Sequence, residues 1–302
     1  MYFDVIEVSE EARVATEPLG TKEKFWYRDN EERVLFKIGR ENTGEDWAEK
    51  IACELCRLIG LPHAKYEFAV WKENRGVVSP SIVPANADLV LGNVILTAMD
   101  RTYPGNRYYR VRQHNLKNVL RFVSIRNINL PIGFEGETGI ETALDVFMGY
   151  LILDAWIANT DRHHENWGVI VTDSKVYLSP TFDHASSMGR NESDKIRREK
   201  LQSNDENRST EGYARRAKSA FYSSNTKGVK LNTFEVVKIA SSACPMACET
   251  WIKRIADIPN EMIRDQFSRI PKDRISELGI DFAVKLLDVN RKRLLKEVEN
   301  IT

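Results

Sequence analysis

Residues 141–178 constrain the fold most strongly, because an apolar helix, a polar loop and two short strands follow one another there. Apolar residues recur at the spacing of one helical face and predict a packed helix over 141–158; they are Val146, Tyr150, Leu153 and Ile157. Strands are predicted at 168–171 and 175–178, on either side of the turn "TDS". The loop "NTDRHHENWG" is therefore held at both ends, which is typical of a loop that carries function.

Composition limits the partners that the chain can have. Lysine and arginine number 44, and aspartate and glutamate also number 44, so the formal net charge is zero. A general nucleic-acid-binding protein needs an excess of cations, and we expect no such binding. The longest strongly apolar run, 146–153, is far shorter than the ~20 residues of a membrane-spanning helix. Because the N-terminus also lacks an apolar leader, we expect a soluble, cytoplasmic protein without a membrane span.

Four cysteines occur as two pairs, in "CELC" (53–56) and "CPMAC" (244–248). Two such pairs could supply the four ligands of a zinc site. The first pair, however, lies inside a segment with helical periodicity and without a glycine to form a zinc knuckle. Buried thiols on a helix are therefore the favoured interpretation.

The first hundred residues read mainly as strands. Strands are predicted at 32–39, 66–71 and 92–99, from alternating or β-branched apolar residues. One helix is predicted at 43–62, and Gly60 is expected to end it.

Beyond residue 100 the pattern becomes mainly helical, and it ends in an amphipathic helix over 282–299. The charged, weakly apolar stretch 190–230 is predicted to be a mobile loop with some helix. The expected fold class is α+β with two lobes. A strand-rich N-terminal lobe, 1–100, would precede a larger helical lobe, 101–302, with the join near 97–106.

Three polar residues occur in an order that suits phosphoryl transfer. Asp161 is followed by Asn166 after four intervening residues, and Asp183 follows the predicted pair of strands. In phosphoryl transfer, one carboxylate accepts the proton of the attacking hydroxyl group. An amide oxygen and a second carboxylate hold magnesium. We predict the first role for Asp161 and the metal-binding role for Asn166 and Asp183.

Lys37 lies between two apolar residues in the strand predicted at 32–39. A lysine is costly to bury there without a partner, and the helix that follows offers Glu45, Glu49 and Glu54. Glu49 shares a helix face with the cysteines of "CELC" and is the predicted partner. The alternative is a lysine at a strand edge whose amine reaches water.

A phosphate-binding loop is the last element that such a site needs. "PLGTKEKFW" (18–26) precedes the Lys37 strand, and Gly20 allows close approach of backbone donors to a phosphate. A plain hairpin turn explains the same residues nearly as well.

The segments "LDAWIANTDRHHENWGVIV" and "YLSPTFDHASSMG" together resemble the catalytic core of HipA-like serine/threonine kinases. Weaker similarity extends to "PLGTKEKFW", "LFK" and "GEDWAEKIACELCRLIGLPHA". The resemblance implies a two-lobed, protein-kinase-like fold that binds ATP and Mg²⁺ between its lobes. Full-length members carry a further N-terminal subdomain, so a compact, stand-alone member is expected. "DFG" is absent, and Asp183 lies in "TFDHAS" instead.

By this resemblance Asp161, Asn166 and Asp183 take the roles given above, and Lys37 binds and orients the phosphates of ATP. Glu49, the partner predicted from the helix face, would hold Lys37 in that position. The resemblance further implies that His163 lies near the phosphates. The phosphate-covering loop would contain Gly20, Thr21 and Lys22, and the adenine-contacting hinge would contain Thr97, Ala98 and Met99.

The activity implied is ATP- and Mg²⁺-dependent phosphorylation of a serine or threonine in a protein substrate. Family members include toxins, so a toxin–antitoxin role with a neutralising or regulatory partner is implied as well. We also expect autophosphorylation on a serine of 190–230.

Three alternatives stay open: a lipid or small-molecule kinase, a nucleotide-binding pseudokinase that acts as an interaction module, and a metal-dependent phosphohydrolase. The last would use a metal site built from His163, His164, His184, Asp161 and Asp183.

Overall fold

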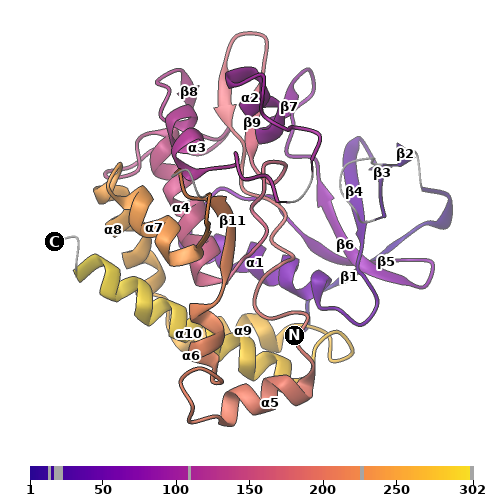
Figure 1. The fold of residues 1–302 in the computed structure, drawn as a ribbon. Coiled ribbons are helices and arrows are strands. Elements are labelled where there is room, and N and C mark those ends of the chain that lie inside the picture. The colour runs from indigo at the N-terminus through magenta and orange to yellow at the C-terminus, as the bar shows by residue number, and fades with distance from the viewer. Residues whose placement is uncertain (13–14, 17–22, 108–109, 225–227, 300–302) are drawn as a thin grey trace.

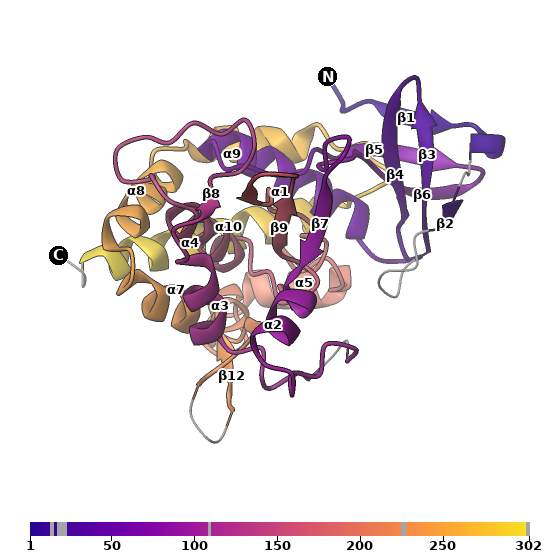
Figure 2. The same cartoon turned by 90° about the horizontal axis from the view of Figure 1, so that it is seen from above.

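The fold was obtained as a computed structural model, which describes residues 1–12, 15–16, 23–107, 110–224 and 228–299. A six-stranded sheet forms one lobe, and helices form most of the other (Figure 1). Seen from above, the sheet stands to one side of the helical lobe (Figure 2). The expected α+β, two-lobed fold class is confirmed.

The N-terminal sheet has the strand order β1-β5-β6-β4-β3-β2, in which only the β1–β5 pairing is parallel. Its strands are β1 (Val5–Val8), β2 (Ala15–Thr16), β3 (Lys24–Asp29), β4 (Glu32–Ile38), β5 (Glu67–Trp71) and β6 (Asn74–Pro80); the short helix η1 (Glu10–Ala12) follows β1. One face is filled by aromatic rings, with Phe25 5.2 Å from Phe36 and 4.8 Å from Trp71 between ring centroids. Because side chains alternate across a strand, Lys37 of β4 points to the opposite face from Phe36.

Helix α1 (Glu45–Ile59) lies between the sheet and the helical lobe (Figure 1). Trp47, Ile51 and Leu55 are buried along it, as the spacing of its apolar residues predicts. Gly60 ends the helix in the left-handed conformation, with φ of 67°, which glycine adopts without a steric penalty. The helix predicted at 43–62 is therefore confirmed, together with its end.

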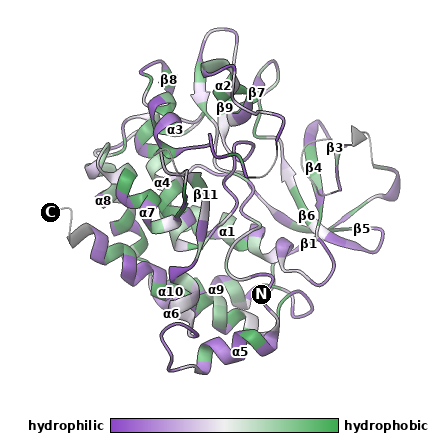
Figure 3. Ribbon diagram, in the orientation of Figure 1, coloured by the Kyte–Doolittle hydropathy of each residue, from purple (hydrophilic) through white to green (hydrophobic). Residues whose placement is uncertain are grey.

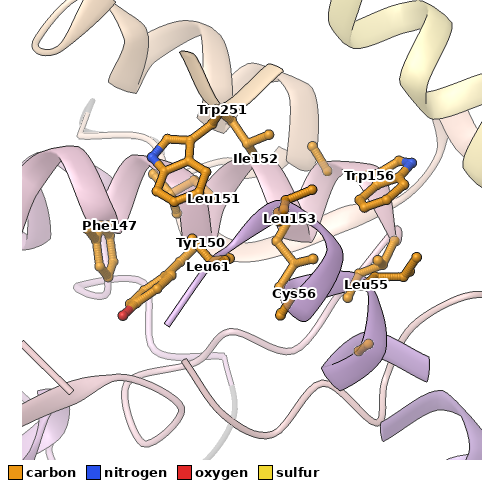
Figure 4. Close-up of a cluster of buried hydrophobic side chains, with 14 of the residues drawn as sticks. Leu55, Cys56, Leu61, Phe147, Tyr150, Leu151, Ile152, Leu153, Trp156 and Trp251 are labelled. Atoms are coloured by element: carbon orange, nitrogen blue, oxygen red, sulfur yellow. The ribbon is translucent and has the colours of Figure 1, made fainter. Parts of the chain in front are cut away.

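Helix α4 (Ala143–Trp156) runs through the centre of the second lobe. The sequence predicts one apolar stripe, but the helix is buried on nearly all sides, which is typical of a central helix. Side chains from α1, α4 and α8 meet in one cluster around it (Figure 4). Helix α5 is largely hydrophilic by comparison, and α10 mixes hydrophilic and hydrophobic residues (Figure 3). The remaining helices of the lobe are α3 (Leu116–Val123), α5 (Asp194–Gln202), α6 (Thr210–Arg215), α7 (Thr233–Ser241), α8 (Pro245–Ala256), α9 (Asn260–Ser268) and α10 (Glu277–Glu299).

A second sheet, of order β7-β9-β10-β8, carries the polar loop. Its strands are β7 (Asp88–Leu91), β8 (Ile128–Asn129), β9 (Gly168–Val171) and β10 (Val176–Leu178). Strand β7 pairs with β9 of the helical lobe, so the chain passes from one lobe to the other within 81–87.

The strand predicted at 92–99 is wrong, because these residues form helix α2 (Gly92–Met99). Its first turn is fixed by tertiary contacts: the N–H groups of Gly92 and Asn93 donate to the carbonyl oxygens of Trp167 and His164, both at 2.9 Å. These bonds outweigh the β-propensity of the valine, isoleucine and threonine in the segment.

The stretch 190–230, predicted to be a mobile loop with some helix, contains helix as expected and also a strand that was not predicted. That stretch contains α5, α6 and strand β11 (Lys218–Tyr222), which pairs with β12 (Lys230–Asn232) in a two-stranded hairpin. Capping explains this order in a weakly apolar sequence, since the side chains of Ser193 and Ser209 accept hydrogen bonds at the starts of α5 and α6.

A loop between α9 and α10 fastens the helical lobe to the N-terminal sheet. Arg274 donates to Asp46 of α1 at 2.7 Å, and to the carbonyl oxygens of Ala69 at 3.3 Å and Gly76 at 3.4 Å. The two charged side chains are only 2% and 8% exposed. Burial raises the pKa of Asp46, and Arg274 opposes that shift. We call these four residues the interlobe clamp.

The cysteines of both pairs are buried free thiols, as the sequence favours. Burial raises the pKa of Cys53 to about 11 and that of Cys56 well above its ordinary value. Within the described ranges, no helix is both long and apolar enough to cross a membrane.

Candidate active site

Lys37 is buried on β4 and pairs with two carboxylates. Its Nζ lies 2.9 Å from Glu49 Oε2 and 3.1 Å from Asp183 Oδ1, which joins β4, α1 and the segment after β10. Burial alone lowers the pKa of the amine, but the carboxylates of Asp183 and Glu49 outweigh it and raise the pKa well above its ordinary value. Lys37 is therefore charged at neutral pH, and the pair with Glu49 predicted from the sequence is present.

Of the three candidate glutamates on α1, only Glu49 pairs with Lys37 among the residues that the structure describes. Glu45 and Glu54 pair with cations of their own, each at 2.7 Å. The second oxygen of Glu49 accepts the backbone N–H of His184 at 2.7 Å. Glu49 thus connects α1 to the strand lysine and to the segment that carries Asp183.

Asp161 and Asn166 are held in the loop between α4 and β9 by the loop's own hydrogen bonds. Asn166 Nδ2 donates to the carbonyl oxygen of Asp161 at 2.7 Å, and the N–H of Asp161 donates to Asn159 Oδ1 at 3.2 Å. Ser186 Oγ donates to Asp161 Oδ2 at 3.4 Å, from the segment after Asp183. The four-residue spacing therefore closes a compact loop with a defined position for the carboxylate.

A buried ion pair fastens this loop to α4. Arg162 donates to both carboxylate oxygens of Asp154, from Nη2 to Oδ1 at 2.8 Å and from Nε to Oδ2. Its Nη1 also donates to the carbonyl oxygen of Asn166 at 3.1 Å. The side chains of the pair are 2% and 7% exposed, so it is almost fully removed from water. Sequence reasoning missed this pair, although an aspartate near the end of an apolar helix was a usable signal.

A cavity of about 320 Å³ lies between the lobes and is lined by both. Lys37, Asn166 and Asp183 line it. Asp161 and His163 line a second, smaller cavity of about 50 Å³. The structure therefore brings Lys37, Glu49 and Asp183 into contact, and it places Asp161 and Asn166 on one loop between two cavities.

The structure places Thr97, Ala98 and Met99 on α2, and none of them lines the larger cavity. The corresponding wall is formed by residues of 79–83 and 87–91, where the chain passes between the lobes. Sequence reasoning missed this wall because 79–83 contains no charged residue that would mark it. Gly20, Thr21 and Lys22 lie outside the described residues.

Asn166 and Asp183 offer oxygen atoms of the kind that Mg²⁺ prefers. The amide nitrogen of Asn166 is used by the carbonyl oxygen of Asp161, so Oδ1 is the atom left for a ligand. Asp183 adopts the left-handed conformation, with φ of 59°. This costs a non-glycine residue ~1 kcal/mol and is typical of functional positions. The donor set therefore fits a hard divalent cation.

The histidines do not converge on one point. His164 Nδ1 lies 2.7 Å from the hydroxyl of Tyr103, and His184 Nε2 lies 2.8 Å from Thr181 Oγ1. Burial lowers the pKa of His163 and of His164 to about 4, so both rings are uncharged at neutral pH. In the part of the chain that the structure describes, no three His, Cys, Asp or Glu residues are arranged to hold a metal. This geometry does not support the phosphohydrolase alternative.

His114 packs behind the polar loop, 159–168. Its Nε2 accepts from Trp167 Nε1 at 3.2 Å, its Nδ1 lies 3.2 Å from the carbonyl oxygen of Ala220, and its ring stacks on Phe221 at 4.6 Å. These contacts need a neutral ring, and burial lowers its pKa to about 3.

As the pH falls, the free energy of unfolding should therefore decrease more for wild type than for His114→Gln. The unfolded chain gains a proton at His114 near pH 6.5, whereas the folded chain stays neutral to about pH 3. Within this window, the free energy of unfolding of wild type should fall by ~1.4 kcal/mol for each unit by which the pH is lowered. Between pH 7 and pH 5, we expect wild type to lose about 2 kcal/mol more than the variant in urea unfolding. The same pH dependence in both proteins would contradict a buried neutral ring.

The fold matches solved kinases. The Helicobacter pylori proinflammatory kinase CtkA aligns with a TM-score of 0.74 at 18% identity, over 97% of this chain and 98% of that chain. HipA of Shewanella oneidensis MR-1, solved with HipB and its operator DNA, aligns with a TM-score of 0.61 at 11% identity, over 96% of this chain and 67% of that chain. No family model matches the sequence, and no curated protein matches it either.

The fold is that of a two-lobed, protein-kinase-like protein. More narrowly, it is the fold of the HipA-like kinases, as the resemblance of the catalytic segments indicates.

Proposed function

We propose that the protein transfers the γ-phosphoryl group of ATP to a serine or threonine hydroxyl of a protein substrate. One observation supports this most: Lys37, Asn166 and Asp183 line the cavity between the lobes, and the loop that carries Asn166 also carries Asp161. These four residues come from three separate parts of the chain: β4, the loop between α4 and β9, and the segment after β10. A pseudokinase would have no use for all four groups.

Each residue has a role in the proposed transfer. Lys37, held by Glu49, binds and orients phosphate oxygens of ATP. Asp161 accepts the proton of the acceptor hydroxyl, whose oxygen forms a bond to the γ-phosphorus. The bond between that phosphorus and the bridging oxygen of ADP breaks, and ADP carries away the electron pair. His163 is neutral and contributes a polar ring rather than a charge.

Asn166 and Asp183 would hold Mg²⁺, which neutralises charge on the phosphates when it is bound. Asp183 also contacts Lys37, so the metal-binding carboxylate and the phosphate-binding amine keep a fixed separation. The fixed separation lowers the entropy lost when the phosphates are aligned.

Removing Mg²⁺ should abolish transfer, and restoring it should recover the activity. The measurement is transfer of label from γ-labelled ATP to a library of serine and threonine peptides, with and without EDTA. Undiminished transfer in EDTA would contradict the metal roles. ATP binding without transfer would favour the pseudokinase, and label in a lipid or small molecule would favour the other acceptor class.

The finer functional proposals rest on the same site. Autophosphorylation is proposed on a serine of 190–230, where Ser224 is exposed and lies beside the described end of the β11–β12 hairpin. Ser193 and Ser209 already cap helices, and Ser219 is buried, so these three are poorer acceptors. A protein partner is proposed from the HipA structure, which contains HipB and operator DNA.

A further inference from the structure

The smaller cavity, of about 50 Å³, lies beside the proposed base. It is lined by Arg110, Thr160, Asp161, His163, Tyr222 and Lys230, among others. Because Asp161 is the group that accepts the proton, an acceptor hydroxyl has to reach this position. This cavity is therefore the entrance for the acceptor, on the proposed function.

The hairpin β11–β12 forms one wall of the entrance and is firmly attached. The N–H of Tyr222 donates to the carbonyl oxygen of His114 at 3.0 Å, and His114 in turn contacts Trp167 of the polar loop. Tyr222 and Lys230 face each other across the hairpin. The hairpin thus holds Lys230 at a defined place relative to Asp161.

Four exposed cations lie at or beside this wall. Arg110 and Lys230 line the entrance, and Lys218 lies on the partner strand of the hairpin. Arg112 lies against Gly228, where a Cβ would lie 3.5 Å from its side chain. None of these cations forms an ion pair with another residue that the structure describes. Burial lowers the pKa of Lys230, Asp161 opposes this shift, and Lys218 adds to it, so the two lysines repel each other.

The size of the cavity suits a small acceptor group. A cavity of about 50 Å³ has room for a group the size of a serine or threonine hydroxymethyl. The rest of the acceptor must lie on the surface outside, among the four cations.

We propose that Arg110 and Lys230, supported by Arg112 and Lys218, select serine or threonine acceptors that are flanked by aspartate or glutamate in a protein segment. This inference rests on the proposed function and adds the substrate class. Carboxylates on either side of the hydroxyl would neutralise these cations and relieve the repulsion between the lysines.

Two peptides test this substrate preference. They are identical except that the residues flanking a single serine are aspartate in one peptide and lysine in the other. Wild type should prefer the acidic peptide by about tenfold in kcat/KM, from two partly exposed ion pairs of about threefold each. Lys230→Glu should remove or reverse the preference. The matched control is Lys238→Glu, which reverses an exposed lysine on α7 away from the entrance and should keep the preference.

Equal rates on both peptides in wild type would overturn the inference. So would a Lys230→Glu protein in which both rates fall by the same factor, since Lys230 would then act on the transferred phosphate. If Lys230→Glu does not fold, the wild-type preference must still fall as salt rises to about 1 M, where the Debye length is about 3 Å. Mg²⁺-dependent ATP hydrolysis without phosphorylation of either peptide overturns only this inference, whereas no Mg²⁺-dependent use of ATP at all overturns the proposed function.

Discussion

Replacing Asp161 with asparagine is expected to slow phosphate transfer by about 10²–10⁴-fold, the usual contribution of a general base. The substitution keeps the size of the side chain and removes the group that accepts the proton. The backbone contacts that position residue 161 should survive, because they run through its own N–H and carbonyl groups to Asn159 and Asn166. Binding of ATP should change little, since Asp161 does not line the larger cavity.

The measurements are initial rates of label transfer, equilibrium binding of ATP, and the mass of the protein after incubation with ATP. Asp173→Asn is the matched control, because Asp173 is an exposed aspartate in the turn after β9. The control should keep the wild-type rate and any self-phosphorylation. A wild-type rate in Asp161→Asn would show that this carboxylate is not the base.

Asp154→Ala is expected to lower the free energy of unfolding by about 3–5 kcal/mol, because it leaves the guanidinium of Arg162 buried without its carboxylate. Arg162 also holds the carbonyl oxygen of Asn166, so activity should fall together with stability. Urea unfolding and label transfer under the same conditions test both parts.

Asp281→Ala provides the comparison. Asp281 accepts from Arg264 at 2.8 Å, but the two side chains are 45% and 52% exposed. Removal of such an exposed ion pair should lower the free energy of unfolding by less than about 1 kcal/mol. An equal loss of unfolding free energy in the two variants would mean that the Asp154–Arg162 pair does not fasten the polar loop.

The charged residues of the site could be predicted from sequence because they stand out from their surroundings. Lys37 interrupts a buried strand, and Asp161 and Asn166 form a polar loop between apolar elements. The helical period separates Glu49 from Glu54, which lies on another face of α1. It does not separate Glu49 from Glu45, one turn earlier on the same face, which the structure pairs with Arg190 instead.

Features that depend on tertiary contacts could not be predicted in this way. Residues 92–99 have strand-like composition, yet a helix starts there because Gly92 and Asn93 donate hydrogen bonds to carbonyl oxygens of the polar loop. The cavity wall at 79–83 depends on where the chain crosses between lobes, which no local pattern encodes. Arg162 drew no attention because its importance lies in Asp154, eight residues earlier and in another element.

The interlobe clamp has a consequence for the populations of conformers. Moving α1 away from the cleft would separate Asp46 from Arg274 and leave a buried charge unpaired, at a cost of about 3–5 kcal/mol. Since every 1.4 kcal/mol is a factor of ten, fewer than about 1% of molecules would occupy the displaced state. Lys37 and Glu49 would thus be assembled before any nucleotide arrives, and on the proposed function a scarce binding-competent state would not reduce the affinity for ATP.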